Sequence, residues 1–216
     1  MTKRVLLLKP GVTSSRAVLG DYEAWFSRAT GGASMHPVEL HAGERPPAVD
    51  GFDAVIMTGS PLSVTQPTEW MERAADPVLG VCFGHQLLAW RHGARVVRNP
   101  QGRELGTVFV ELTAAGRSCP LLGALPPRFD VQATHEDMVV KGDAPLEVLA
   151  TNEKCALQAF SVGRQAWGVQ FHPEMDAASI AFCIDSKDTR AEDRRGAVAR
   201  ETAWGARLLQ RFVELA

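Results

Sequence analysis

The chain has 216 residues, a formal net charge of −2 at pH 7 and a hydrophobic content of 45%. These values are typical of a folded globular protein, and we expect one domain over residues 1–216. The near-neutral charge excludes the strongly basic surface that nucleic acid or an anionic membrane attracts, so we expect neither partner. The apolar run Val5–Leu8 is too short for a membrane span or a signal peptide, which predicts a cytoplasmic protein.

The four cysteines are widely and irregularly spaced, at Cys82, Cys119, Cys155 and Cys183. No C-x-x-C pair is present, which argues against a disulfide framework and against a structural zinc site. The sequence also lacks a P-loop and a G-x-G-x-x-G fingerprint. We therefore expect neither a metal nor a cofactor.

The first half of the chain alternates short apolar runs with segments of helical periodicity. Such alternation predicts an α/β fold with a doubly wound, mostly parallel, flavodoxin-like sheet. The strand at Met35–Leu40 is the weakest because it contains Pro37. The other expected strands are Arg4–Leu8, Phe52–Met57 and Pro77–Val81, and the expected helices are Leu19–Arg28, Thr68–Ala75 and Gly84–His92.

The pattern changes after Gly93, where strand-like segments follow one another with no long helix between them. This half predicts an added mixed or antiparallel segment of sheet. The segments are Val96–Val97, Thr107–Leu112, Phe129–Ala133, Leu146–Ala150, Leu157–Phe160 and Gln165–Gln170. Two helices are expected to follow, at Ala177–Ile184 and Ala197–Leu215, with a charged surface loop or polar turn between them.

The segment Gly80-Val81-Cys82-Phe83-Gly84 has the G-x-nucleophile-x-G form of a nucleophile elbow. Glycines on both sides permit a tight strand-to-helix turn, in which a side chain two residues away would collide. Such a turn places the thiol at a helix N-terminus, which favours the thiolate, and aims the N–H of Phe83 at a developing oxyanion. A buried structural cysteine at the end of a core strand is the competing interpretation of Cys82.

A thiol nucleophile needs a base, and His172 in the segment VQFHPE is the best candidate. The apolar run before it is expected to deliver His172 to the carboxyl edge of the sheet, where ligand sites of open α/β sheets lie. Pro173 ends the strand, and Glu174 can then hold one imidazole nitrogen and fix the tautomer. A histidine at a strand end is, taken alone, more often a packing or surface residue.

Two other histidines stand in polar or helical contexts. His85 follows Cys82 by three residues and could face the site, although such a Cys/His pair recurs by chance. His135 lies in the polar cluster THED after an expected strand and could line a pocket.

Taken together, these motifs resemble the class I (triad) glutamine amidotransferases, in their GMP-synthetase-like branch. The nucleophile motif is GVCFGHQ at residues 80–86, and the base motif is VQFHPE at residues 169–174. TGSP at residues 58–61 is similar to the family's oxyanion loop, and ATHED at residues 133–137 is similar to its SHxD segment. The matches come in the family's order from residue 4 to about residue 184.

The resemblance implies a glutaminase reaction that passes through a γ-glutamyl thioester. Cys82 would attack the glutamine side-chain amide, and the N–H groups of Gly59 and Phe83 would form the oxyanion hole. His172, oriented by Glu174, would protonate the departing ammonia and then act as base for water.

The resemblance further implies that Gln86 helps to bind glutamine and that the backbone near Thr134 and His135 holds its amino-acid end. The sequence departs from the family in two places. Ser60 stands where a second glycine is common, and the segment 70–77 before the nucleophile strand is short.

Three functions remain open at this point. The first is a glutaminase that passes ammonia to a separate synthase, because the chain contains no synthetase module. The second is a stand-alone hydrolase of γ-glutamyl peptides or amides. The third is a catalytically silent regulatory protein of the same fold, against which the presence of Cys82, His172 and Glu174 argues.

Overall fold

The structure is a computed structural model that describes residues 2–66, 71 and 78–216. The expected helix at Thr68–Ala75 and the short segment 70–77 lie, apart from Met71, outside the described residues. The strands are β1 (Arg4–Lys9), β2 (Ser34–Glu39), β3 (Ala54–Met57), β4 (Leu79–Val81), β5 (Arg95–Arg98), β6 (Glu104–Leu112), β7 (Arg128–His135), β8 (Asp137–Val140), β9 (Leu146–Thr151), β10 (Ala159–Val162) and β11 (Ala166–Val169). The helices are α1 (Arg16–Leu19), α2 (Tyr22–Ala29), α4 (Phe83–Arg91), α5 (Ala114–Ser118), α6 (Ala177–Asp185), α7 (Ala191–Arg194) and α8 (Trp204–Leu215), with 3₁₀ turns η1 (Leu40–Ala42) and η2 (Val49–Gly51).

Nine of these strands form one sheet in the order β2-β1-β3-β4-β11-β10-β9-β6-β7. The pairs from β2 to β11 are parallel, and those from β11 to β7 are antiparallel. Strands β5 and β8 pair separately. The prediction of an α/β fold, with a parallel sheet in the first half and an antiparallel part in the second, is confirmed.

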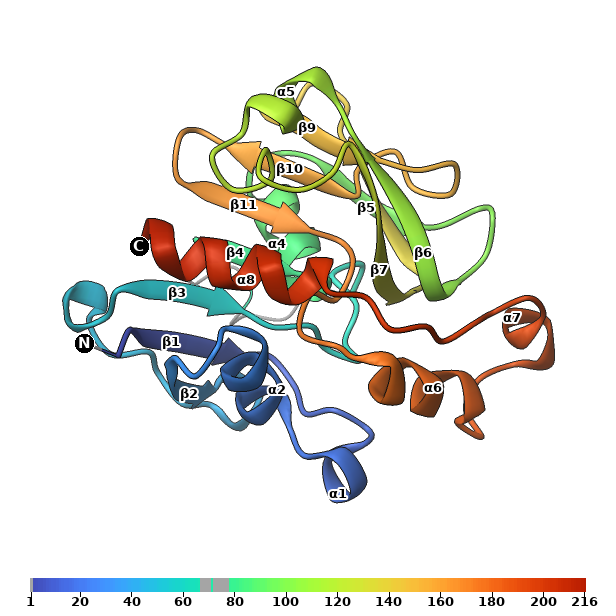
Figure 1. Cartoon of the computed structure of the whole chain (residues 1–216), viewed down its shortest axis with the longest axis horizontal. Helices are drawn as coiled ribbons and strands as arrows, with labels where there is room; N and C mark the ends of the chain where they lie inside the picture. The colour runs from blue at the N-terminus through green and yellow to red at the C-terminus, as the bar shows by residue number, and fades with distance from the viewer. Residues whose placement is uncertain (1, 67–70, 72–77) are drawn as a thin grey trace.

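Helices cover both faces of the parallel part, as Figure 1 shows for α8 and α2 on the near side and α4 behind the sheet. Alternate residues of β1 explain this layering, because successive side chains of a strand point to opposite faces. Val5 and Leu7 join the core that contains residues of α2 and α8, whereas Leu6 and Leu8 join the core that contains Phe83 of α4. A strand buried on both faces reads as a near-continuous apolar run, and β1 is apolar from Val5 to Leu8, between Arg4 and Lys9 at its ends.

The edge position of β2 explains why Pro37 is tolerated within a strand. Pro37 pairs in register with Leu7 of β1, and β2 is the outermost strand of the sheet. Proline lacks an N–H donor, so it is confined to edges where no second neighbour needs that bond.

The expected helix Ala197–Leu215 is too long at its N-terminus, because α8 begins at Trp204. The preceding segment is held as extended chain along β6 instead. The N–H of Thr107 donates to the carbonyl of Val198 at 2.7 Å, and the main chain of Val198 lies directly against Gly106. Apolar periodicity alone did not distinguish this backbone pairing from a first helical turn.

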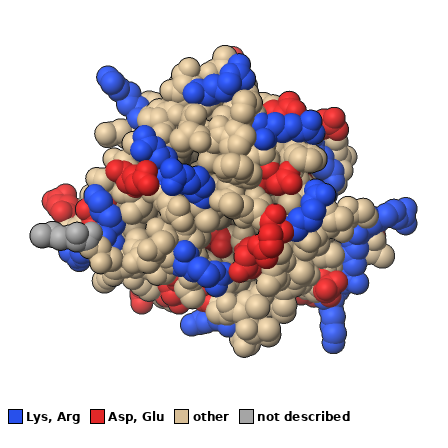
Figure 2. Space-filling view, in the orientation of Figure 1, with Lys and Arg blue, Asp and Glu red and all other residues tan. Residues whose placement is uncertain are grey.

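The described residues contain no helix that is long and apolar enough to span a membrane. On the face shown in Figure 2, basic and acidic side chains are interspersed over the surface.

Candidate active site

Three neighbouring parallel strands deliver the predicted site to one edge of the sheet. Strand β4 lies between β3 and β11, and all three run in the same direction. The chain that leaves their carboxyl ends carries Gly59 after β3, Cys82 after β4 and His172 after β11. The crevice at such an edge is the usual ligand site of an open α/β sheet.

The backbone at Cys82 is strained. Its φ of 50° and ψ of −99° make it the one non-glycine residue with positive φ in the described part of the chain. Its N–H donates to the carbonyl of Val169 at 2.9 Å, and its carbonyl accepts from the N–H of Gln86 at 3.0 Å, which begins α4. The elbow therefore ties the thiol between β11 and the first turn of α4. Such strain is typical of functional positions.

Strand β11 and strand β7 together hold His172 in place. The N–H of His172 donates to the carbonyl of Gln132 at 2.7 Å, which forms an isolated antiparallel bridge. The ring Nδ1 lies 2.7 Å from Oε1 of Glu174, and both side chains are almost fully buried. Cys82 contributes to the electrostatic environment of the same ring.

Opposing effects act on the pKa of His172. Burial lowers it, but the charges of Glu174 and Cys82 and the hydrogen bonds to both raise it well above its ordinary value of 6.5. The net direction is upward, so the environment favours the imidazolium form. An imidazolium beside a thiol is the arrangement that stabilises a thiolate nucleophile.

Gly59 packs directly against both partners of this pair. A β-carbon at Gly59 would fall 2.8 Å from Cε1 of His172 and 3.5 Å from Cβ of Cys82. The next residue, Ser60, accepts a hydrogen bond from the N–H of Leu62 at 3.1 Å and lies against Gly11 of the β1–α1 loop. Serine instead of glycine at position 60 is thus accommodated in the turn.

The three residues that the resemblance assigns to glutamine binding lie together beside this site. Gln86 donates to the carbonyl of Asp137 at 3.2 Å. One ring nitrogen of His135 forms a hydrogen bond with the Asp137 carbonyl, at 2.9 Å, and the other forms one with the buried carboxylate of Glu104, at 2.8 Å. Thr134 stands next to His135 on β7, and its hydroxyl accepts from Arg103 at 2.8 Å.

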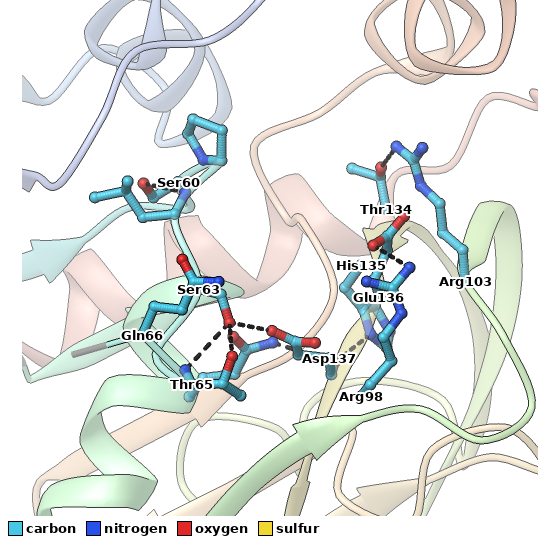
Figure 3. A pocket seen from close by; sticks show the side chains of 13 residues that line it. Ser60, Ser63, Thr65, Gln66, Arg98, Arg103, Thr134, His135, Glu136 and Asp137 are labelled. Carbon is cyan, nitrogen blue, oxygen red and sulfur yellow. Dashed lines mark hydrogen bonds and ion pairs between the residues drawn. The ribbon is translucent and has the colours of Figure 1, made fainter. Parts of the chain in front are cut away.

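These residues line a cavity of about 370 Å³, shown in Figure 3. Ser60, Gln86, Arg103, Thr134 and Asp137 are among its lining residues, whereas Cys82 and His172 are not. Ser60 follows Gly59 directly, and Gln86 lies one helical turn after Cys82, so the cavity adjoins the Cys82–His172 pair. Its volume is in the range of small-molecule sites.

His85 does not face this cavity. It is fully buried, its ring packs at a tilt of 53° against Phe160 with centroids 4.7 Å apart, and Gly168 lies against its Nδ1. Burial lowers its pKa to about 3, so it is a neutral core residue. The expectation that His85 could reach the site is therefore wrong.

The structure adds neighbours that the sequence motifs did not indicate. The hydroxyl of Tyr22 lies 3.5 Å from where a Gly59 β-carbon would be. Burial, followed by the charges of Glu174 and Cys82, raises the pKa of Tyr22. Gln132 contributes its main-chain carbonyl to the N–H of His172, and Arg103 lines the adjoining cavity. Both contacts join residues far apart in sequence, so no local pattern indicated them.

A metal centre finds no support in the described part of the chain, which contains no group of three or more His, Cys, Asp or Glu side chains able to hold an ion. The four cysteines are free thiols.

Comparison with known proteins identifies the family. The family model for glutamine amidotransferase class-I matches residues 33–179. The chain is 37% identical over 135 residues to a glutamine-hydrolyzing GMP synthase of Thermomicrobium roseum, an alignment that covers 60% of this chain and 25% of that protein. It is 32% identical over 141 residues to one subunit of the glutamine-hydrolyzing GMP synthase of Halobacterium salinarum, covering 64% of this chain and 75% of that relative.

The fold has close counterparts among solved structures. A glutamine amidotransferase of Thermotoga maritima superposes with a TM-score of 0.72 and 23% identity over 99% of both chains. This likeness supports the fold. For several curated relatives, by contrast, the chain spans 55% of the relative's length or less. The match of the family model over most of the sequence establishes that this chain belongs to the class-I glutamine amidotransferase family.

Proposed function

We propose that this protein hydrolyses the side-chain amide of glutamine, with Cys82 as nucleophile, His172 as acid and base, and Glu174 as the residue that orients His172. The Cys82 thiolate attacks the amide carbon, and the N–H groups of Gly59 and Phe83 stabilise the resulting oxyanion. His172 then donates a proton to the nitrogen as the C–N bond breaks, which releases ammonia and leaves a γ-glutamyl thioester.

The thioester is then hydrolysed by water. His172 is neutral after giving up its proton, so it accepts a proton from the attacking water molecule. The tetrahedral species collapses to glutamate and expels the Cys82 thiolate, which restores the starting state. At the adjoining cavity, Gln86 is proposed to help bind the glutamine, and the backbone near Thr134 and His135 is proposed to hold its amino-acid end.

One observation carries the proposal: the strained Cys82, the buried His172–Glu174 pair and the tightly packed Gly59 meet at the ends of three adjacent parallel strands. A buried structural cysteine would not need a positive φ, and a silent fold would not need a carboxylate beside the histidine. Cys82 and His172 have both features. The family membership is consistent with this chemistry.

A separate synthase is the proposed acceptor of the ammonia. This part of the proposal draws on the Halobacterium salinarum relative, whose name describes one subunit of a GMP synthase and so implies a second for that protein. A cytoplasmic location belongs to the proposal as well and depends on the sequence alone.

The test is release of ammonia and glutamate from glutamine by the purified chain, with a γ-glutamyl dipeptide assayed in parallel. Cys82→Ala should abolish turnover, and Cys119→Ala is the matched control because both cysteines are 7% exposed. Retained turnover in Cys82→Ala would refute the mechanism. Fast dipeptide cleavage with slow glutamine turnover would favour a γ-glutamyl hydrolase.

Silence on both substrates would leave two explanations, a partner-gated enzyme and a silent fold. A glutamine-like electrophile distinguishes them, because it should label Cys82 only if the nucleophile is activated. Lack of labelling would contradict the proposed function.

A further inference from the structure

The cavity beside the site contains one arginine that has no acidic partner. Two terminal nitrogens of Arg103 donate to hydroxyls, to Thr134 at 2.8 Å and to Thr189 at 3.4 Å. Its Nε is buried and has no hydrogen-bond partner, and no carboxylate lies within ion-pair distance among the described residues. A guanidinium has five N–H donors, so two neutral acceptors leave most of its capacity unused.

The position of Arg103 is well defined by its surroundings. The ammonium of Lys154 donates to the Arg103 carbonyl at 2.6 Å, which fixes the main chain at this point. Thr189, which anchors the side chain from the opposite direction, is buried and donates to the carbonyl of Cys183 at 2.7 Å. In Figure 3 the guanidinium reaches over Thr134 at one side of the cavity.

The other charged side chains that line the cavity are an ion pair and a single carboxylate. Arg98 forms an ion pair with Glu136 at 2.6 Å. Asp137 has no cationic partner among the described side chains, and its carboxylate accepts from the hydroxyl of Ser63. Among the described residues that line the cavity, Arg103 is thus an unpaired cation and Asp137 an unpaired carboxylate, and these two charges complement the carboxylate and ammonium of an amino-acid group.

We infer that Arg103 is a specificity residue that binds a carboxylate of the γ-glutamyl substrate. This inference depends on the proposed function for the identity of the substrate. Planar, bidentate donors make arginine well suited to carboxylate recognition, and the partly buried setting strengthens the interaction. Two carboxylates could occupy the position: the α-carboxylate of the glutamyl group, which the acidic Asp137 nearby favours, or a carboxylate on the leaving group of a γ-glutamyl peptide.

The test measures binding to the full chain that carries Cys82→Ala, so that no turnover is required. Calorimetric titrations would give the dissociation constants of four probes: glutamine, γ-glutamylglycine, γ-glutamylmethylamide and the α-carboxamide of glutamine. Each constant would be compared between the Cys82→Ala chain and the same chain that also carries Arg103→Gln. Charge-assisted hydrogen bonds predict that Arg103→Gln weakens binding of the recognised carboxylate by about 10- to 100-fold. Arg103→Lys, which keeps the charge but loses the fork, should fall between the two.

The pattern across the probes identifies the carboxylate. Weakening for glutamine, γ-glutamylglycine and γ-glutamylmethylamide, with none for the α-carboxamide, assigns Arg103 to the α-carboxylate. Weakening for γ-glutamylglycine alone assigns it to the leaving group. Either pattern supports the inference.

Arg128→Gln is the matched control, since Arg128 lies on the same strand as Thr134 but is exposed, is paired with Glu111 at 3.5 Å and does not line the cavity. It should change each dissociation constant by less than about twofold. Thermal unfolding of each variant reports whether the fold is retained. Equal weakening for every probe, or none, would overturn the inference and leave Arg103 as a structural clamp between Thr134 and Thr189.

The binding assay separates failure of this inference from failure of the proposed function. Binding that is indifferent to residue 103, together with turnover by the native chain, overturns only the role of Arg103. If no glutamyl probe binds the Cys82→Ala chain and the glutamine-like electrophile does not label Cys82 in the native chain, both are overturned.

Discussion

Gly80 and Gly84 flank the Cys82 turn, and main-chain atoms lie so close to each of them that neither can carry a side chain. A β-carbon at Gly80 would fall 2.4 Å from the carbonyl oxygen of Gly84, and one at Gly84 would fall 2.6 Å from the carbonyl oxygen of Met57. Both obstacles are main-chain atoms, which cannot rotate away. The two glycines therefore permit the tight turn in which Cys82 has a positive φ.

The first prediction concerns this packing. Gly80→Ala should destabilise the fold by about 1–3 kcal/mol, because overpacking must move the backbone, and amide hydrolysis should fall with the displaced thiol. Gly51→Ala is the control, since the nearest atom to its β-carbon is the flexible Arg4 Nη1 at 3.9 Å. Urea unfolding and glutaminase assays would measure both effects. Unchanged stability in Gly80→Ala would show that the elbow relaxes freely.

The second prediction concerns the pH dependence of turnover. The carboxylate of Glu174 helps to hold the pKa of His172 well above 6.5, so the active imidazolium form persists to alkaline pH and is lost as the pH rises through the raised value. Glu174→Gln keeps a hydrogen-bond acceptor but removes the charge. The alkaline limb of kcat/KM should then move to lower pH, because a neutral acceptor stabilises the imidazolium less than a carboxylate does.

The matched control for this pH profile is Glu214→Gln, whose carboxylate is half exposed and pairs with Arg211 at 3.3 Å. Its profile should coincide with that of the native chain. An alkaline limb that stays in place in Glu174→Gln would mean that Glu174 does not act on the charge of His172.

Those parts of the site that lie within one short stretch of chain were predictable from sequence. Cys82 with its two glycines, and His172 with Glu174, are local motifs at the ends of apolar strands, and the structure places the two motifs together because β4 and β11 are neighbours. Buried parallel strands are near-continuous apolar runs, which is why their positions were also predictable.

The parts that depend on distant contacts could not be predicted in the same way. Arg103 gains its place by bonds to Thr134 and Thr189, which are 31 and 86 residues away in sequence. The segment before α8 has helical periodicity, but a hydrogen bond from Thr107 to Val198 draws it along β6. Tertiary pairing of this kind overrides local preference and leaves no periodic signal.

The third prediction concerns the buried carboxylate of Glu104. It accepts from Asn152 and Gln158, both at 2.6 Å, and from His135 at 2.8 Å. Glu104→Gln would set an amide NH₂ against these donors, and breaking such a buried pair costs about 3–5 kcal/mol. Glu111→Gln is the control because its ion pair with Arg128 is exposed, at 3.5 Å, and should contribute at most about 1 kcal/mol.

The stability that Glu104→Gln loses should depend on pH, and the direction of that dependence follows from the pKa of Glu104. Burial raises the pKa of Glu104, but the hydrogen bond and charge of His135 and the two amide donors outweigh it, so the net shift is below 4.5. A lowered pKa contributes stability that is full above 4.5 and disappears as the pH falls through the lowered value. The difference in unfolding free energy between native and variant chains should therefore shrink in acid, and a difference independent of pH would contradict this assignment.

The last prediction concerns Lys9, which is fully buried at the carboxyl end of β1. Its ammonium lies 2.8 Å from a carboxylate oxygen of each of Asp21, Glu23 and Glu39. Lys9→Met would keep the buried stem but leave three carboxylates without their shared cation, so unfolding should become easier by about 3–5 kcal/mol. Lys3→Met, which removes only an exposed pair with Asp53 at 3.4 Å, should cost no more than about 1 kcal/mol.

Loss of Lys9 should also reach the site, because Asp21 connects the two. The Asp21 carboxylate accepts from the N–H of Thr13 at 3.2 Å and from the N–H of Tyr22 at 2.9 Å, and Tyr22 packs against Gly59. Without the buried ammonium, Asp21 keeps only the exposed guanidinium of Arg16, at 3.6 Å, as an ionic partner. The chain between β1 and α2 should then be held less firmly, and the proposed oxyanion hole should loosen. Glutamine turnover in Lys9→Met should therefore fall mainly in kcat at a temperature where the variant is still folded, and a kcat equal to that of Lys3→Met would show that the cluster supports stability alone.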